Sequence, residues 1–137
     1  QSNICFDNDG VGGFVDGFIE DAKEFKNGGR AINDEHYKNL KSQCFIKSGD
    51  SVGRNEYFIP PHLANRQYDD NSTFKEQLLR ERKAIKRAKP DYDGKMAVIP
   101  KQEMKVFLNG KSPDLLDALM QIEFFYQIPE EPDVDYY

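Results

Sequence analysis

The stretch Lys111-Ser-Pro-Asp-Leu-Leu-Asp-Ala-Leu-Met120 predicts the start of a packed helix around which the chain is organised. Ser112 is a residue type favoured at the N-cap, and Pro113 suits the first helical position, where no backbone N–H is needed. Apolar side chains then recur at the spacing of one buried helical face: Leu115, Leu119, Ile122 and Tyr126. We therefore expect a helix that ends near Pro129 with this face turned towards the core.

Two acidic residues in the first turn of this helix have two interpretations. Asp114 and Asp117 are three positions apart, so they lie on a common face. Carboxylates that project together can hold a divalent cation through hard oxygen ligands. They are also typical of ordinary first-turn acids, which the positive end of the helix dipole favours. The spacing alone leaves both interpretations open and favours the second.

Composition limits the class of protein. The 137 residues suffice for one domain with a core, and 38% are hydrophobic and 31% charged. The net charge of −5 argues against nucleic-acid binding through overall charge but allows a local basic patch. No apolar run approaches the roughly 18 residues that cross a bilayer. Cys5 and Cys44 have no CxxC spacing and no partner in His36 or His62, so we expect reduced thiols and no zinc site.

The amino-terminal region predicts a βαβ unit. Ile4-Cys-Phe6 is typical of a short buried strand, and Asp7-Asn-Asp-Gly-Val-Gly-Gly13 of a tight turn. Apolar spacing predicts a helix from Val11 to Phe25, and Arg30-Ala-Ile-Asn33 is a candidate second strand, parallel to the first. The turn lacks the P-loop ending and the GxGxxG pattern, so a phosphate-binding metabolic domain is a weaker interpretation.

The middle of the chain alternates expected helices with short extended segments. We expect a helix after Asn33, a loop over 48–53, strands over 56–59 and 95–99, a long helix over 72–88 and a short one over 101–108. The long helix places Arg80, Lys83 and Arg87 on one face. This stripe is interpreted either as a contact to a phosphate backbone or as a solvated helix face.

An acidic cluster emerges if these elements pack together. Asp7 lies where a strand ends, the usual place for a functional group in a sheet with parallel strands. With Asp114 and Asp117 it would form a cluster that is costly when empty. Filled by Mg²⁺ or Mn²⁺, the cluster would support phosphodiester hydrolysis. Lys101 could then offset negative charge in the transition state, or be an ordinary surface lysine.

Four short motifs in series resemble one family. They are Phe6-Asp-Asn-Asp-Gly-Val-Gly-Gly13, Tyr37-Lys-Asn-Leu40, Asp93-Gly-Lys-Met-Ala-Val-Ile-Pro-Lys101 and Ser112-Pro-Asp-Leu-Leu-Asp-Ala-Leu119. Their order and separations resemble the carboxyl-terminal nuclease domain of phage large terminase subunits across nearly all of residues 3–127. The resemblance implies an α/β, ribonuclease H-like fold, with a mixed sheet flanked by helices, that cuts concatemeric viral DNA during packaging.

The resemblance also implies site residues. It implies an acidic triad with two Mg²⁺ or Mn²⁺ ions, in which Asp7 matches the second acid and the Ser-Pro-Asp-x-x-Asp helix supplies the third. Asp114 ranks slightly above Asp117 for this role, and Asp9 ranks behind both. Arg80, Lys83, Arg87 and Lys101 would contact double-stranded DNA. Other partners would be the terminase small subunit and the portal, in the cytoplasm of a bacterial host carrying a phage or prophage.

One departure from the family is important. The first acid of such domains lies on an opening strand that would precede Gln1, so we expect a partial nuclease domain over 1–128 and an acidic mobile tail over 129–137. An open sheet edge would then favour a homodimer, and nuclease activity of the chain alone would be low. The alternative is a non-catalytic module that docks DNA or a packaging subunit through the basic helix over 72–89.

Overall fold

The computed structural model describes residues 4–8, 17–34 and 36–129. The strands are β1 (Cys5–Asp7), β2 (Lys23–Phe25), β3 (Gln67–Asp69) and β4 (Ser72–Thr73). The helices are α1 (Leu40–Gly53), α2 (Pro61–Ala64), α3 (Phe74–Ala84), α4 (Lys101–Phe107), α5 (Asp114–Met120) and α6 (Ile122–Gln127), and a 3₁₀ turn spans Ile32–Asp34. The Gly-rich turn over 9–13, the start of the helix expected from Val11 and the acidic tail over 130–137 lie outside the described residues.

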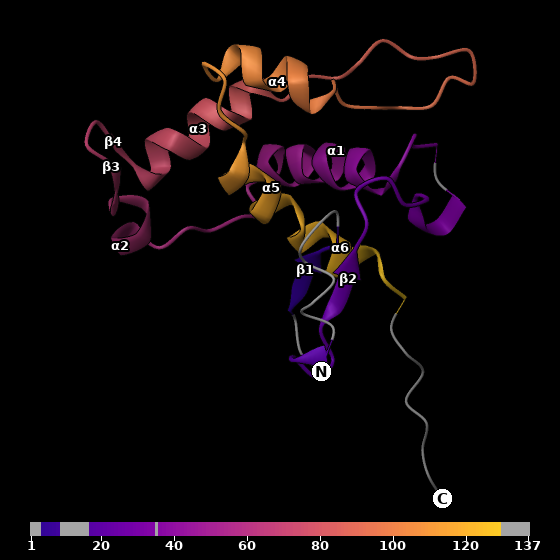
Figure 1. The fold of residues 1–137 in the computed structure, drawn as a ribbon, viewed down its shortest axis with the longest axis horizontal. Coiled ribbons are helices and arrows are strands. Elements are labelled where there is room, and N and C mark those ends of the chain that lie inside the picture. The colour runs from indigo at the N-terminus through magenta and orange to yellow at the C-terminus, as the bar shows by residue number, and fades with distance from the viewer. Residues whose placement is uncertain (1–3, 9–16, 35, 130–137) are drawn as a thin grey trace, which may run out of the picture.

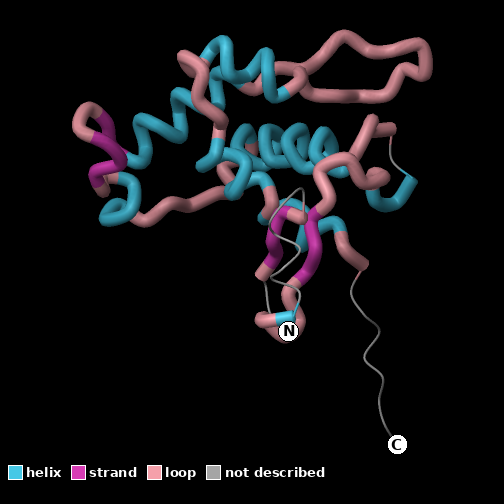
Figure 2. Tube along the Cα trace, viewed as in Figure 1, coloured by secondary structure: helices cyan, strands magenta, loops and turns pink. Residues whose placement is uncertain are grey.

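Helix α1 is the centre of the molecule (Figure 1). Helices α5 and α6 pack against it, and α3 packs against α5. The residues of the main core come from β2, α1, α3, α5 and α6: Phe25, Leu40, Cys44, Phe45, Leu78, Leu116, Met120 and Phe124. Figure 2 shows the helical layer with the short strands at its margins. The predicted α/β class is confirmed, with two small sheets among the described residues.

The predicted parallel strand pair is present, but its second strand was placed wrongly. β1 pairs in parallel with β2, and Asp7 lies opposite Phe25. The expected helix is wrong for residues 17–25, because Asp21 has a φ of 64° and Phe18 is 86% exposed. Phe25 is instead fully buried at the end of β2, where its ring meets that of Phe124 edge-on with centroids 5.4 Å apart.

Helix α1 is longer at its carboxyl end than the sequence predicts. It begins after Asn39, whose side chain accepts a hydrogen bond from the Ser42 backbone N–H. It continues through the segment 48–53, which was expected to be a loop because it contains Gly49 and Gly53. Burial of one helical face outweighs the low helix propensity of glycine. The strand expected over 56–59 is also wrong, since this segment is irregular.

Helix α3 starts with a complete capping box and ends earlier than expected. The Thr73 hydroxyl accepts from the Glu76 backbone N–H, while the Glu76 carboxylate accepts from the Thr73 backbone N–H. The chain is extended from Ile85, and Arg87 forms an antiparallel bridge with Val98. Arg87 therefore does not share a helical face with Arg80, and the predicted continuous stripe is wrong.

The helix predicted from residue 113 is divided into α5 and α6 at Gln121. Its start is confirmed, but the buried face is displaced by one position from the prediction. Ile122 and Tyr126 are exposed, and the buried apolar residues are Leu116, Met120 and Phe124. Ser112 does not cap the helix, since no side-chain cap bond is present at this end. Helix α6 packs against α1, and its Phe124 contacts Phe25 of β2.

Both cysteines are free, as the sequence predicts. The Cys5 thiol donates to Gln121 Oε1 at 3.1 Å, which connects β1 to the α5–α6 junction. Burial, with a smaller contribution from the Glu123 carboxylate, raises the pKa of the Cys44 thiol to about 12. Among the residues described, no helix is long and apolar enough to cross a membrane.

Candidate metal centre

The side chain of Asp117 lies between two lysines. It projects from the first turn of α5 and is 19% exposed. Lys101 Nζ, from the start of α4, donates to Asp117 Oδ2 at 3.1 Å. Lys41 Nζ, from the first turn of α1, lies 3.4 Å from Oδ1. Side chains from α1, α4 and α5 thus converge on one carboxylate.

The two oxygens of Asp117 differ. Oδ1 is buried and accepts no hydrogen bond from any described residue, although Lys41 forms an ion pair with it at 3.4 Å. Lys41 therefore compensates the negative charge of Asp117, but its ammonium group does not donate a hydrogen bond to Oδ1. A buried acceptor left without a donor is unusual in folded proteins and calls for an additional partner. A hard cation is one such partner, because it needs only an oxygen lone pair.

Lys101 lies within electrostatic range of all three predicted acids. Burial alone would lower the pKa of its ammonium group, but the pKa is raised. The hydrogen bond to Asp117 and the negative charges of Asp117, Asp114 and Asp7 outweigh burial, in that order. Lys101 thus remains protonated and charged beside the acids. The acids that act on Lys101 come from β1 and α5.

The other two acids are more open to solvent than Asp117. Asp7 is the last residue of β1, as predicted for a functional group at a strand end, and Asn27 Nδ2 donates to its Oδ1 at 3.0 Å. Asp114 is the exposed first residue of α5. Across the described ranges, no three His, Cys, Asp or Glu side chains gather closely enough to form a metal site by themselves. Asp9 lies outside those ranges.

A buried glutamate, which the sequence analysis missed, positions α5. Glu81 is fully buried on α3, where its Oε2 accepts from the Leu116 backbone N–H at 2.8 Å. Its Oε1 accepts from Gln77 Nε2 at 2.9 Å. Glu81 takes the place of a local cap for α5. A signal existed, because Glu81 occupies the inward position between Leu78 and Ile85 on the predicted apolar face of its helix.

The residues predicted to bind DNA have different surroundings in the structure. Lys101 lies with the acids, as described above. Arg80 Nη1 donates to Gln77 Oε1 at 2.9 Å, next to buried Glu81. Lys83 and Arg87 line a pocket between α3 and α1. Lys101 thus lies beside Asp117, while Lys83 and Arg87 line a different pocket.

Comparison with known proteins identifies the class of fold. No family model matches the chain, and no curated protein matches it. The fold is that of a ribonuclease H-like nuclease domain, with structural similarity to the nuclease domain of the large terminase subunit gp2 of bacterial virus Sf6. That structure is 26% identical to this chain with a TM-score of 0.57, and the match covers 86% of this chain and 63% of that chain.

Mutant forms of the same domain match similarly. A form with manganese is 25% identical with a TM-score of 0.57, and one with calcium is 25% identical with a TM-score of 0.55. Each match again covers 86% of this chain and 63% of the other. The predicted resemblance to the nuclease domain of phage large terminase subunits is therefore confirmed. The present chain spans somewhat less than two thirds of the length of the domains it matches.

Proposed function

We propose that this chain is part of the metal-dependent endonuclease domain of a phage or prophage terminase, which cuts concatemeric DNA during genome packaging. The observation that carries the proposal is the Asp117 carboxylate, half enclosed between α1, α4 and α5 with one buried oxygen that lacks a hydrogen bond. The charges of Asp7 and Asp114 act on the same lysine as Asp117. Carboxylates contributed by separate elements are typical of a cation site.

Asp117 and Asp7 would be the principal cation ligands, with Asp114 as a more exposed third. Two carboxylates with several waters are a suitable donor set for Mg²⁺ or Mn²⁺. A bound cation would supply an acidified water and a counter-charge for the phosphate. Asp117 is preferred over Asp114 because it is less exposed and has the unsatisfied oxygen.

The two lysines would have separate tasks. Lys41, whose side chain is 17% exposed, holds the Asp117 carboxylate in position and compensates its charge. Lys101, whose side chain is 42% exposed, can reach solvent and therefore a DNA phosphate. Its raised pKa keeps it cationic throughout the physiological range. Double-stranded DNA would be the substrate, with Arg80, Lys83 and Arg87 as more remote phosphate contacts.

Cation binding tests this function directly. We expect millimolar Mn²⁺ to raise the melting temperature of the chain, because a ligand that binds only the folded state stabilises it. Asp117→Asn should abolish the Mn²⁺-dependent increase, and the matched exposed variant Asp70→Asn should retain it. An equal increase in wild type and Asp117→Asn would refute the site. The absence of any Mn²⁺ effect would favour the non-catalytic interaction module.

A plasmid-nicking assay tests the activity separately. We expect at most weak Mn²⁺-dependent nicking by this chain alone, because two-metal hydrolysis requires a tighter acidic group than the described residues form. Any nicking should disappear in Asp117→Asn and fall in Lys101→Ala. Robust cutting by the chain alone would contradict the expected weakness and support the nuclease assignment. Cutting that persists in Asp117→Asn would remove this residue from the mechanism.

A further inference from the structure

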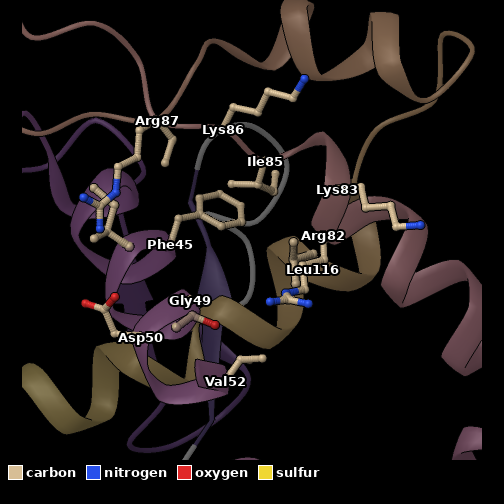
Figure 3. A pocket seen from close by; sticks show the side chains of 13 residues that line it. Phe45, Gly49, Asp50, Val52, Arg82, Lys83, Ile85, Lys86, Arg87 and Leu116 are labelled. Atoms are coloured by element: carbon tan, nitrogen blue, oxygen red, sulfur yellow. The ribbon is translucent and has the colours of Figure 1, made fainter. Parts of the chain in front are cut away.

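A pocket of about 450 Å³ lies between the middle of α1 and the segment that follows α3 (Figure 3). Its apolar lining comes from α1, α5 and the segments beside the Arg87–Val98 bridge: Phe45, Ile46, Val52, Ile85, Val98 and Leu116. Gly49 on α1 also lines it and leaves open space where a side chain would stand. The volume and the apolar lining are suitable for one or two large hydrophobic side chains.

Four cationic residues surround this apolar lining: Arg82, Lys83, Lys86 and Arg87. Figure 3 shows Arg82 and Arg87 extending towards α1 on opposite sides of the Phe45 ring, while the ammonium ends of Lys83 and Lys86 point away. Lys86 Nζ instead lies over the Phe107 ring, 3.8 Å from its centroid. Within the described part of the chain, no carboxylate forms an ion pair with any of the four.

Arg82 and Arg87 offer charge-assisted donors to a ligand. Both are exposed, and among the described residues no side chain accepts a hydrogen bond from either guanidinium group. Asp50 also lines the pocket, but it pairs with neither arginine. A suitable ligand combines carboxylates for Arg82 and Arg87 with an apolar group for the space between them.

We propose that this pocket binds an acidic peptide segment that carries a large apolar or aromatic side chain. Double-stranded DNA fits the pocket less well, because its bases are stacked inside the duplex and its exposed phosphates have no apolar group for the lining. The pocket is a different site from the candidate metal centre, but Lys83 and Arg87 line it, so a bound peptide would compete with the remote DNA contacts proposed for these two residues.

The sequence itself contains a segment with the required chemistry. Residues 130–137 read Glu-Glu-Pro-Asp-Val-Asp-Tyr-Tyr, with acidic side chains beside one valine and two tyrosines. This segment is therefore a suitable probe for an acidic peptide with aromatic side chains. A synthetic peptide of this sequence, labelled at its amino end, can be titrated with the full chain and followed by fluorescence anisotropy.

The arginines and the peptide charges provide the first arm of the test. Arg82→Gln combined with Arg87→Gln should weaken peptide binding by roughly tenfold or more, because charge-assisted hydrogen bonds are lost. The matched double variant Arg66→Gln with Lys75→Gln removes the same charge from exposed positions outside the pocket and should bind nearly as wild type. Equal weakening in both double variants would indicate non-specific electrostatic attraction and overturn the proposal.

Gly49 provides the second arm, which leaves every charge unchanged. Gly49→Leu should fill the pocket and reduce peptide affinity by roughly tenfold, since one buried side chain contributes about this much. Gly49→Ala adds only a methyl group in open space and should bind within about twofold of wild type. A peptide with both tyrosines replaced by serine should bind as weakly as the original peptide binds Gly49→Leu.

Three further results would overturn the proposal. The first is no binding of the acidic peptide at about 1 mM. The second is binding that Gly49→Leu leaves unchanged, because the peptide then lies elsewhere. The third is tighter binding of a single-stranded oligonucleotide of equal charge that is itself lost in Gly49→Leu, which would assign the pocket to nucleic acid. A failure of the Mn²⁺ experiment would affect none of these outcomes.

Discussion

The two sides of α5 hold charges in opposite ways. Asp117 faces a site where one carboxylate lies between Lys41 and Lys101. Leu116, the residue before it, lines a pocket where Arg82 and Arg87 have no described carboxylate. One side has a carboxylate paired with two lysines, and the other has two arginines that pair with no described carboxylate, although Asp50 lines the same pocket. The net charge of −5 indicates neither arrangement.

The difference shows which kind of ligand each side lacks. The acid side has charge compensation but an oxygen without a hydrogen bond, which a cation would satisfy. The pocket side has unused donors and an apolar lining, which an acidic peptide would satisfy. Both sides depend on the position of α5, and Glu81 of α3 holds the first turn of that helix. Variants of Glu81 should therefore affect both sides, and variants of Asp117 only one.

Removal of Glu81 should disturb both sides together and have the largest effect. Glu81→Ala leaves the Leu116 N–H and the Gln77 amide without their buried acceptors. We expect the free energy of unfolding to fall by about 2–4 kcal/mol, since each unsatisfied buried group costs about 1–3 kcal/mol. Urea unfolding measures the loss. The exposed helical control Glu103→Ala should change it little, and equal losses in the two variants would exclude the capping role.

The pH dependence of Glu81→Gln tests the same residue with a conservative change. Burial raises the pKa of Glu81 above its ordinary value of 4.5, although hydrogen bonds from Gln77 and Leu116 oppose the shift. Between the pKa of the unfolded state and the higher pKa of the folded state, Glu81 is protonated in the folded state and ionised in the unfolded state. The resulting stabilisation is complete below pH 4.5 and is lost as the pH rises through the higher pKa of the folded state. As the pH rises through this range, the free energy of unfolding of wild type should therefore fall relative to that of Glu81→Gln. Urea unfolding at several pH values measures the difference.

Asp117→Asn should disturb only the acid side. The change leaves Lys41 and Lys101 close together without their shared carboxylate, and Lys41 is largely buried. We expect a loss of about 1–3 kcal/mol in the free energy of unfolding, because charged hydrogen bonds at a partly buried site are removed. The control Asp91→Asn breaks the exposed pair with Lys38 and should have little effect. Peptide binding at the pocket should be unchanged in both variants.

The sequence predicts the parts of this comparison that depend on local patterns. The strand end at Asp7, the start of α5 near Pro113 and the short helix α4 all follow from turn, cap and periodicity signals. The family resemblance adds the order of the motifs. These features are local, and therefore one sequence is enough to find them.

Features that depend on tertiary contacts could not be predicted in the same way. Phe25 fits a helical pattern, but it pairs in β2 because β1 lies beside it. Gly49 and Gly53 suggested a loop, although the buried face of α1 continues through them. The charged environment of Asp117 needs Lys41, which no sequence signal connects to it. Glu81 could have been noticed as a polar residue in an apolar face, but its partner at Leu116 could not.

Thr73→Ala should destabilise the helix that carries the pocket arginine Arg82. The variant removes the hydroxyl that accepts from the Glu76 backbone N–H and breaks the capping box. A loss of about 1 kcal/mol in the free energy of unfolding is expected from the removal of such a cap. Thr73→Ser keeps the hydroxyl and should restore most of the stability in urea unfolding. If serine fails to do so, packing of the threonine methyl group accounts for the effect.

Gly49→Ala should have the smallest effect, and of opposite sign. Gly49 is exposed within α1, and an added Cβ has no atom within 4 Å. Alanine restricts the unfolded chain and favours the helix, so the free energy of unfolding should rise by about 0.5–1 kcal/mol. Gly53 also has open space, but it is the last residue of α1, where helix propensity matters less, and Gly53→Ala should gain less. A loss of stability in Gly49→Ala would mean that the space beside Gly49 is filled in solution, and the pocket that faces Leu116 would then be closed to a peptide.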